Sequence, residues 1–275
     1  VETAVNAIKL GAYDFIEKPF KTDRLLLVVA RALEAAHLRR ENRYLKKEIT
    51  PPQMIGRSLA IQTVRKTIEK VAPTNSRVLM IGPAGVGKEL AARELHSISK
   101  RASGPFLVFH CRADSEKSIE NHLFGLEATA HSSRKIGALE QAHGGTLLLD
   151  EVTELPLDVQ AKLVRFLHEQ AFKRVGGNLK VAVDVRILAT SQHDIKAAID
   201  AGSFREDLYY RLNVITLHLP PLKDHSEDIP DLVSYFVEQL AQQAGVAKRQ
   251  FSESTLALMK TYDWPGNVYE LRNVV

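Results

Sequence analysis

The stretch "RVLMIGPAGVGKEL", residues 77–90, decides the fold of this chain. An apolar run leads directly into a glycine-rich turn, and a helical pattern begins at Lys88. The turn fits the phosphate-binding pattern G-x-x-x-x-G-K at Gly82, Gly87 and Lys88, whereas Glu89 stands where that pattern has serine or threonine. In a strand–turn–helix unit of this kind, backbone N–H groups and the positive end of the helix face one concavity. The stretch therefore predicts a phosphate site.

Short apolar runs alternate with helical patterns around this unit. The predicted strands are 77–82, 105–111, 146–151, 185–191 and 215–220. Their apolar residues are nearly continuous, which is typical of parallel strands buried on both faces. Helical segments such as 88–99 and 156–170 separate them. This alternation predicts an α/β domain over residues 53–219, with a five-stranded, mainly parallel sheet between helices.

The strands stop after the sequence "LPPL" at 219–222. Helical patterns follow at 226–243, 252–262 and 266–275, which predicts a small helical subdomain over 220–275.

The chain before residue 53 has a different character. Residues 1–21 combine an amphipathic helical pattern with the short apolar run "YDFIEKPF". Residues 22–50 lack glycine and proline and carry alternating charges, which predicts an exposed connector helix that either pairs with a second copy or stands alone. Prolines at 51 and 52 mark the boundary. The chain begins without methionine and stops within a helical pattern, so we expect a fragment of a longer protein.

Composition places few limits on function. The 275 residues are 45% apolar and 25% charged, as in ordinary globular proteins. The single cysteine, Cys111, excludes an internal disulfide, and a net charge of +4 does not by itself indicate nucleic-acid binding. No apolar run reaches the roughly 18 residues that a membrane span requires, and no signal peptide opens the chain. We expect a cytoplasmic protein without membrane partners.

Two adjacent carboxylates support the phosphate site. The strand pattern "GGTLLLDE" ends in Asp150 and Glu151. At the carboxyl edge of a parallel sheet such residues face the ligand crevice. In that position Asp150 would hold Mg²⁺ through water, and Glu151 would polarise an attacking water molecule. Together with residues 82–88, this predicts a nucleotide site.

Seven motifs in order resemble one family. They are "GPAGVGKE", "LFG", "GALEQAHGGTLLLDE", "LVRFLHEQAFKRVGG", "FREDLYYRLNV", "LPPLKDHSEDIP" and "WPGNVYELRN". From Met54 to Val275 the chain resembles the AAA+ central domain of NtrC-type bacterial enhancer-binding response regulators, and "VAPTNSRVLMIGPAG" looks most like the NtrX branch, which acts in nitrogen control. Residues 1–21 resemble the last part of a receiver domain. The resemblance also accounts for Glu89, because these proteins usually carry glutamate after the P-loop lysine.

The resemblance implies ATP or ADP with Mg²⁺, bound between subunits of a dimer or a hexameric ring. It implies a cognate sensor kinase that acts on the receiver domain, and DNA binding through a domain outside this chain. In the family, the segment matching Ile55 and Gly56 lines the adenine pocket, and arginines matching Arg205 and Arg211 reach the neighbour's γ-phosphate. The P-loop residues implied to bind nucleotide are Gly82, Pro83, Ala84, Gly85, Val86, Gly87, Lys88, Glu89 and Leu90.

The sequence departs from the family pattern in four places. The aromatic Gly-Ala-Phe-Thr-Gly-Ala loop that touches sigma-54 is absent around 126–136. His110 replaces an asparagine that switches the catalytic glutamate; a histidine can still hydrogen-bond Glu151, but a free imidazole changes its charge near about pH 6.5, which would alter the switch. Ser191 stands where an asparagine is common; the resemblance implies that it contacts nucleotide, although its shorter hydroxyl reaches a γ-phosphate less well. Tyr269 replaces the lid arginine, for which Arg272 is an imperfect substitute one helical turn away.

These departures leave two main hypotheses. In the first, the domain is the ATP-binding part of a two-component regulator, and nucleotide between subunits sets the assembly that controls transcription. In the second, it is an ATPase that remodels sigma-54 RNA polymerase through a divergent loop at 126–136, because Glu151, Arg205 and Arg211 are all present. A scaffold that holds nucleotide without turnover is a third reading.

Overall fold

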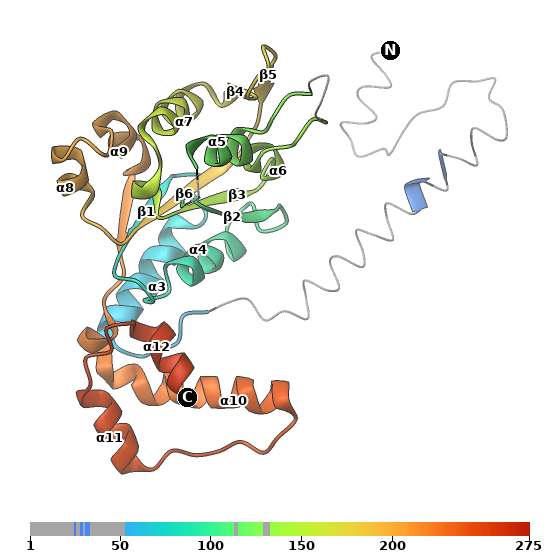
Figure 1. The fold of residues 1–275 in the computed structure, drawn as a ribbon. Helices are drawn as coiled ribbons and strands as arrows, with labels where there is room; N and C mark the ends of the chain where they lie inside the picture. Colours follow the sequence, from blue (N-terminus) through green and yellow to red (C-terminus); the bar gives the residue numbers. More distant parts are fainter. Residues whose placement is uncertain (1–24, 26–27, 30, 34–52, 113–114, 129–132) are drawn as a thin grey trace. The chain divides into compact units, whose positions relative to one another are not determined.

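The computed structural model describes residues 53–112, 115–128 and 133–275, together with helical residues 25, 28–29 and 31–33 (Figure 1). The chain divides into two compact units, Val1–Pro51 and Pro52–Val275. The predicted receiver segment (1–21) and most of the predicted connector helix (22–50) lie outside the described residues.

A five-stranded parallel sheet forms the centre of the second unit. Its strands are β1 Val78–Ile81, β2 Phe106–His110, β3 Thr146–Asp150, β6 Arg186–Ser191 and β7 Ile215–His218. They lie in the order β2-β3-β6-β1-β7, and every neighbouring pair is parallel. All five predicted strands are confirmed. Because β1 lies between β6 and β7, strands flank it on both sides. The turn that follows β1 therefore lies between the carboxyl ends of two neighbouring strands.

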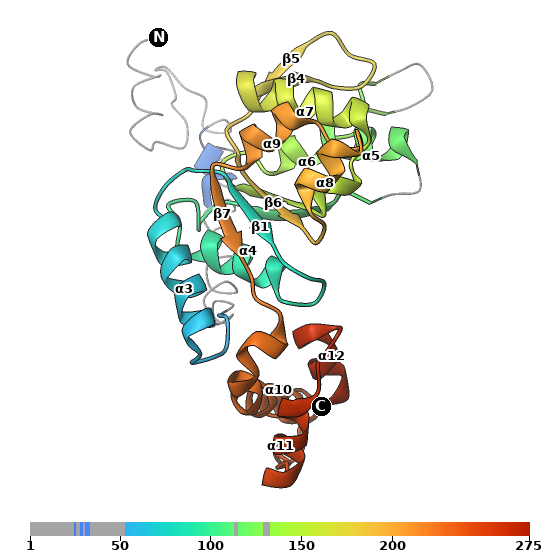
Figure 2. The same cartoon turned by 90° about the vertical axis from the view of Figure 1, so that its left-hand side faces the viewer.

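Helices cover both faces of this sheet (Figure 2). On one face lie α3 Leu59–Val71 and α4 Lys88–Ser97. On the other lie α5 Glu116–Phe124, α6 Ala138–Gln141, α7 Leu157–Glu169, α8 Ile195–Asp200 and α9 Glu206–Leu212. Side chains alternate between the two layers along each strand, so that Leu147 and Leu149 enter one apolar core and Leu148 the other. Burial on both faces explains the continuous apolar runs.

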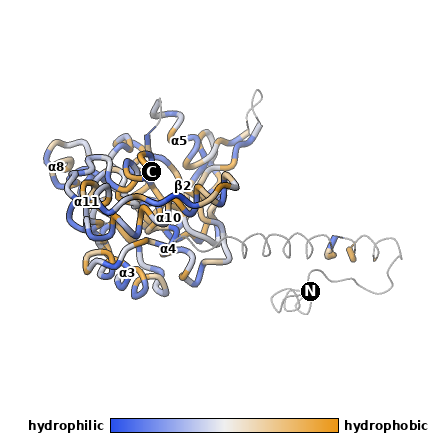
Figure 3. The backbone as a smooth tube through the Cα atoms, turned by 90° about the horizontal axis from the view of Figure 1, so that it is seen from below, coloured by the Kyte–Doolittle hydropathy of each residue, from blue (hydrophilic) through white to orange (hydrophobic). Residues whose placement is uncertain are grey.

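A helical subdomain follows β7. It consists of the 3₁₀ segment η2 Leu222–Asp228 and the helices α10 Ile229–Ala244, α11 Glu253–Thr261 and α12 Asn267–Val274. Its own core contains Leu222, Ile229, Leu232, Val233, Val237, Trp264 and Leu271. Figure 3 colours the backbone by hydropathy and shows polar and apolar segments mixed throughout the described chain. Helix α10 buries one side in this core, whereas no residue of α11 is fully buried. The predicted helical subdomain, called the lid below, is confirmed. Its first α-helix begins at residue 229, whereas the sequence pattern predicted residue 226.

Two elements have no counterpart in the predicted pattern. The short antiparallel strands β4 Ala171–Lys173 and β5 Lys180–Ala182 form a hairpin, and the 3₁₀ turn η1 Val152–Glu154 follows β3. Three-residue strands are too short to give a readable alternation of apolar and polar residues. None of the helices in the described residues combines the length and the apolar character that crossing a bilayer requires.

The end of α7 offers a test of backbone strain. Gln170 caps this helix in the left-handed conformation, with φ 50° and an exposed side chain. Glycine adopts this conformation without a steric penalty, so Gln170→Gly is expected to stabilise the fold by about 1 kcal/mol. Urea unfolding measures the change. The matched control, Gln242→Gly in α10, is expected to destabilise by a similar amount because glycine weakens a helix; equal shifts in both variants would contradict the strain argument.

Candidate active site

The glycine-rich turn forms an open cradle between β1 and α4. Gly85 and Gly87 have φ of 76° and 95°, conformations that favour glycine. Gly87 is the N-cap of α4 and no side chain caps this end, so the N–H groups of the first turn remain available for an anion. Val86 is buried among core residues and anchors the loop, and Leu90 packs beside it. The structure thus gives this loop the geometry of a phosphate site.

Lys88 is the charged centre of the cradle. Its side chain is only 7% exposed, and its Nζ lies 3.1 Å from Glu151 Oε1. The same ammonium group donates hydrogen bonds to the carbonyl oxygens of Gly82 (2.9 Å) and Pro83 (3.1 Å). Glu89 instead points outward and forms an i,i+4 ion pair with Arg93. Glu89 thus belongs to the loop by position, and its side chain is engaged on the helix surface.

Thr190, which is not among the predicted site residues, contacts both Asp150 and Glu151. The hydroxyl of Thr190 donates to Asp150 Oδ1 (2.7 Å) and accepts the backbone N–H of Glu151 (2.8 Å). Thr190 is fully buried on the neighbouring strand β6. Glu151 has a left-handed backbone, with φ 57°, which turns its side chain toward Lys88. Its other carboxylate oxygen accepts the N–H of Gln192 (2.9 Å).

His110 contacts Asp150 in this structure. Its Nδ1 lies 3.0 Å from Asp150 Oδ2. The strand register explains this contact, because His110 pairs directly with Asp150 across β2 and β3. Directly paired residues project on the same face, whereas Glu151 leaves the strand by its left-handed turn.

The Ser191 hydroxyl makes local hydrogen bonds in this structure, and its predicted contact with nucleotide stays a prediction. It is fully buried, and its hydroxyl donates to the carbonyl of His193 (2.9 Å) and accepts the N–H of the same residue (3.2 Å). The hydroxyl that contacts the Asp150 carboxylate and the backbone N–H of Glu151 belongs to Thr190, one residue earlier. Threonine is common in β-strands, so its presence in the pattern does not indicate a role in the site.

The predicted adenine segment lies against the lid. Ile55 packs on the lid core, and Gly56 has φ 141° with no room for a side chain because Asp228 lies against it. A cavity of about 330 Å³ is lined by residues 53–57, Arg65 and residues of α10. Ile55 and Gly56 therefore border a concave region between core and lid.

The predicted lid arginine and the two predicted neighbour-facing arginines make no hydrogen bond or ion pair with the P-loop among the described residues. Arg272 is exposed and forms no hydrogen bond or ion pair with the described part of the chain. Arg205 begins α9 and makes a two-pronged ion pair with Asp207. Arg211 lies in the last turn of α9. The pKa of Arg77 is lowered mainly because Arg77 is partly buried, and also because the positive charge of Arg211 is nearby. Helix α9 and the P-loop helix α4 cover opposite faces of the sheet.

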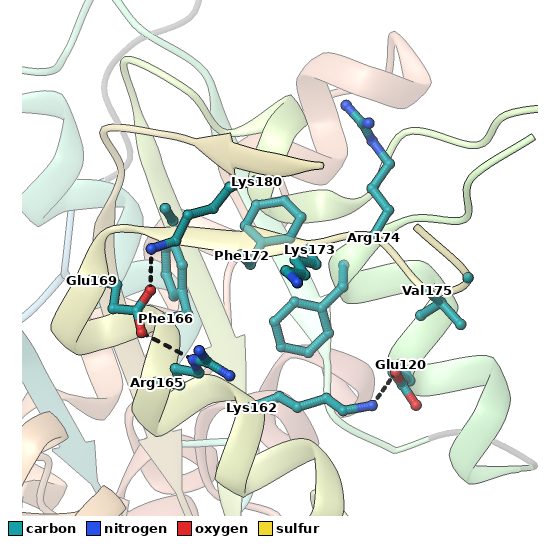
Figure 4. A pocket seen from close by; sticks show the side chains of 13 residues that line it. Glu120, Lys162, Arg165, Phe166, Glu169, Phe172, Lys173, Arg174, Val175 and Lys180 are labelled. Carbon is teal, nitrogen blue, oxygen red and sulfur yellow. Dashed lines mark hydrogen bonds and ion pairs between the residues drawn. The ribbon is translucent and has the colours of Figure 1, made fainter. Parts of the chain in front are cut away.

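A larger cavity lies elsewhere, between α5, α7 and the β4–β5 hairpin (Figure 4). It measures about 480 Å³, and its floor is formed by Phe124, Phe166 and Phe172, whose rings make edge-to-face contacts. Ion pairs cross its rim: Glu169 binds Arg165 and Lys180, and Lys162 binds Glu120. No predicted nucleotide residue lines this cavity. Size alone therefore does not locate the phosphate site in this molecule.

A parallel sheet in the order found here, a P-loop after β1, two carboxylates at the end of β3 and a helical lid define a P-loop NTPase of the AAA+ type. Residues 54–218 match the family described as "Sigma-54 interaction domain", and residues 223–275 match "AAA+ ATPase lid domain". The chain belongs to the sigma-54 interaction domain family of AAA+ proteins.

Relatives of known name and solved structures support this family assignment. The chain is 50% identical over 275 residues to the nitrogen assimilation regulatory protein NtrX of Azorhizobium caulinodans, covering 100% of this chain and 61% of that protein. It is 44% identical to the C4-dicarboxylate transport transcriptional regulatory protein DctD of Pseudomonas aeruginosa, covering 99% and 61%. The crystal structure of NtrX from Brucella abortus in complex with ATP is 48% identical, with a TM-score of 0.78, over 99% of this chain and 62% of that one. The chain thus spans about three-fifths of these relatives' length.

Proposed function

We propose that this chain is the ATP-binding central part of a two-component response regulator for transcription, in which nucleotide bound between subunits sets the assembly state. The observation that carries the proposal is the P-loop cradle with Lys88 at its centre, 3.1 Å from Glu151. A triphosphate supplies the negative charge for which the open N–H groups of α4 and this ammonium group are suited. NtrX of Brucella abortus was crystallised with ADP and with ATP, which supports the same ligands here.

The donor set also fits Mg²⁺. Asp150 accepts one hydrogen bond from Thr190 and lies beside His110, so its carboxylate retains lone pairs for a water ligand of the ion. When bound, Mg²⁺ would neutralise phosphate charge. Glu151 is the residue placed to polarise the attacking water, because it lies next to Asp150 and beside Lys88.

The arginines complete the site from a second copy of the chain. Arg205 and Arg211 form no hydrogen bond or ion pair with the P-loop, Asp150 or Glu151 among the described residues, and α9 covers the opposite face of the sheet from α4. An arginine supplied in trans stabilises the charge that spreads over a transferred phosphoryl group. Assembly as a dimer or a ring therefore belongs to the proposal.

The output of the domain is DNA-dependent control of transcription, through a DNA-binding domain outside this chain and a sensor kinase that acts on the receiver domain. The absence of the aromatic loop hexapeptide around 126–136 favours regulation by assembly over contact with sigma-54. The alternative is an active ATPase that remodels sigma-54 RNA polymerase through its divergent loop. The presence of Glu151 together with Arg205 and Arg211 favours turnover. Open-complex formation at a sigma-54 promoter separates the two hypotheses.

Nucleotide titration tests the proposal. A non-hydrolysable ATP analogue at 100 times its Kd, with Mg²⁺, is expected to stabilise the chain by about 2.7 kcal/mol, seen as a higher melting temperature, and to increase the sedimenting mass. Lys88→Ala is expected to lose both effects. If neither ATP nor ADP changes melting temperature or mass in the wild-type chain, the proposal is wrong.

A further inference from the structure

Four consecutive carbonyl groups of the P-loop, those of residues 82–85, accept hydrogen bonds. Lys88 donates to the first two, those of Gly82 and Pro83. The next two lie at the tip of the loop. Because a peptide plane carries its carbonyl and its N–H group on opposite sides, donors that hold the carbonyl groups also fix the direction of the N–H groups that would bind an anion.

The donors at the tip come from the lid. Asn267 Nδ2 donates to the carbonyl of Ala84 (2.8 Å), and the backbone N–H of Tyr269 donates to that of Gly85 (3.2 Å). The two backbones meet so closely that a side chain at Gly85 would collide with the carbonyl oxygen of Gly266. The first turn of α12 is therefore seated directly on the tip of the P-loop.

The side chain of Asn267, at the start of α12, connects this helix to the P-loop and to the first residue of the lid. Besides its bond to Ala84, its Oδ1 accepts the backbone N–H of Leu222, the first residue of the lid (2.9 Å). The residue is only 3% exposed and has φ 53°, a left-handed conformation that asparagine tolerates better than most residues. Both ends of the side-chain amide are thus used in a buried position, and orientation of the amide is fixed by its two partners.

Among the described residues, no other polar side chain of the lid hydrogen-bonds the P-loop. Tyr269, at the position of the usual lid arginine, is 64% exposed, and Arg272 is exposed and unbonded within the described part of the chain. We propose that Asn267 is a positioning residue that couples the lid to nucleotide binding, by holding the tip of the P-loop in its anion-binding conformation. This rests on the proposed function, because it assumes that the cradle binds a nucleotide.

Two variants separate this role from simple structural support. Asn267→Asp keeps the acceptor for Leu222 and the shape of the side chain, but it loses the donor to Ala84. Asn267→Gly keeps the backbone conformation, adds no charge and loses both bonds. Each is expected to bind a non-hydrolysable ATP analogue with Mg²⁺ roughly three- to tenfold more weakly by calorimetry, which corresponds to one lost hydrogen bond. Without nucleotide, Asn267→Asp is expected to melt at a lower temperature than the wild type because it buries an unpaired carboxylate beside the Ala84 carbonyl, so binding is measured at a temperature at which every variant is folded by circular dichroism.

The matched control is Asn273→Asp, the same change at an exposed position of the same helix. It is expected to bind like the wild type. If Asn267→Asp binds weakly but Asn267→Gly binds normally, the effect is charge repulsion and the proposal is overturned; normal binding by both overturns it as well. Failure of the wild-type chain to bind nucleotide is a separate outcome, which removes the proposed function and this inference together.

Discussion

Replacing Arg211 by alanine is expected to lower the ATP turnover of the assembled chain roughly a thousandfold, because an arginine supplied in trans contributes about 10³–10⁵ in related phosphoryl transfers. Nucleotide binding is expected to persist, since Arg211 lies on α9 and the P-loop precedes α4 on the other face of the sheet. Steady-state phosphate release and calorimetry measure the two properties. Arg165→Ala, which removes an exposed arginine paired with Glu169, serves as the control and is expected to leave turnover unchanged.

A mixing experiment makes this prediction sharper. Glu151→Gln removes the residue that polarises water and is expected to reduce turnover by about 10²–10⁴ on its own. Arg211→Ala subunits retain Glu151, and Glu151→Gln subunits retain Arg211. In an equal random mixture about a quarter of the head-to-tail interfaces combine the two intact residues, so turnover is expected to return to that fraction of the wild type. A mixture no more active than its separate components would show that the site is not shared.

Asp228→Ala is expected to have the largest effect on stability, about 3–5 kcal/mol in urea unfolding, because it removes the charge from a buried network. Asp228 is 1% exposed and accepts the backbone N–H groups of Arg57 (2.6 Å) and Ser58 (2.8 Å). It also accepts the Ser58 hydroxyl (2.5 Å) and lies 3.1 Å from His225 Nδ1. Asp231→Ala is the matched control. It breaks an exposed ion pair with the same Arg57 and is expected to cost no more than about 1 kcal/mol.

The difference in unfolding free energy between the wild type and Asp228→Ala is expected to depend on pH, and the direction of this dependence follows from the pKa of Asp228. Burial by itself raises the pKa of Asp228, but the hydrogen bonds from Ser58, Arg57 and His225 together lower it below its ordinary value. A carboxyl group with a lowered folded-state pKa stabilises the fold above its unfolded pKa, and this contribution is lost as the pH falls through the lowered value. The gap between wild type and Asp228→Ala is therefore expected to narrow below about pH 4. A gap that widens there would contradict the assigned network.

The fold was predictable because its central features are local in the sequence. Each of the five strands is a run of apolar residues buried on both faces, and the P-loop follows one of them without a gap. The β4–β5 hairpin was missed because three-residue strands, separated by "RVGGNL", leave no periodic pattern.

The site was predictable only in part. Lys88, Asp150 and Glu151 belong to local motifs and lie together as expected. Thr190 and His110 depend on which strands are neighbours and in what register, which an isolated strand pattern does not reveal. Asp228 reads as one more charge in the polar segment "KDHSEDIP", although it is almost fully buried. Asn267 bonds a carbonyl 183 residues away, a distance in sequence at which no local pattern carries information.

The contact between Lys88 and Glu151 has a consequence for the order of events. In the structure the lysine and the carboxylate neutralise each other, and Glu151 is further held by the N–H of Gln192. Under the proposed function, a triphosphate would compete with Glu151 for the same ammonium group, and its binding would release the carboxylate to polarise water. A subunit without nucleotide would keep Glu151 paired with Lys88. Part of the attraction between phosphate and lysine would then offset the lost Lys88–Glu151 ion pair, which would lower the affinity for nucleotide.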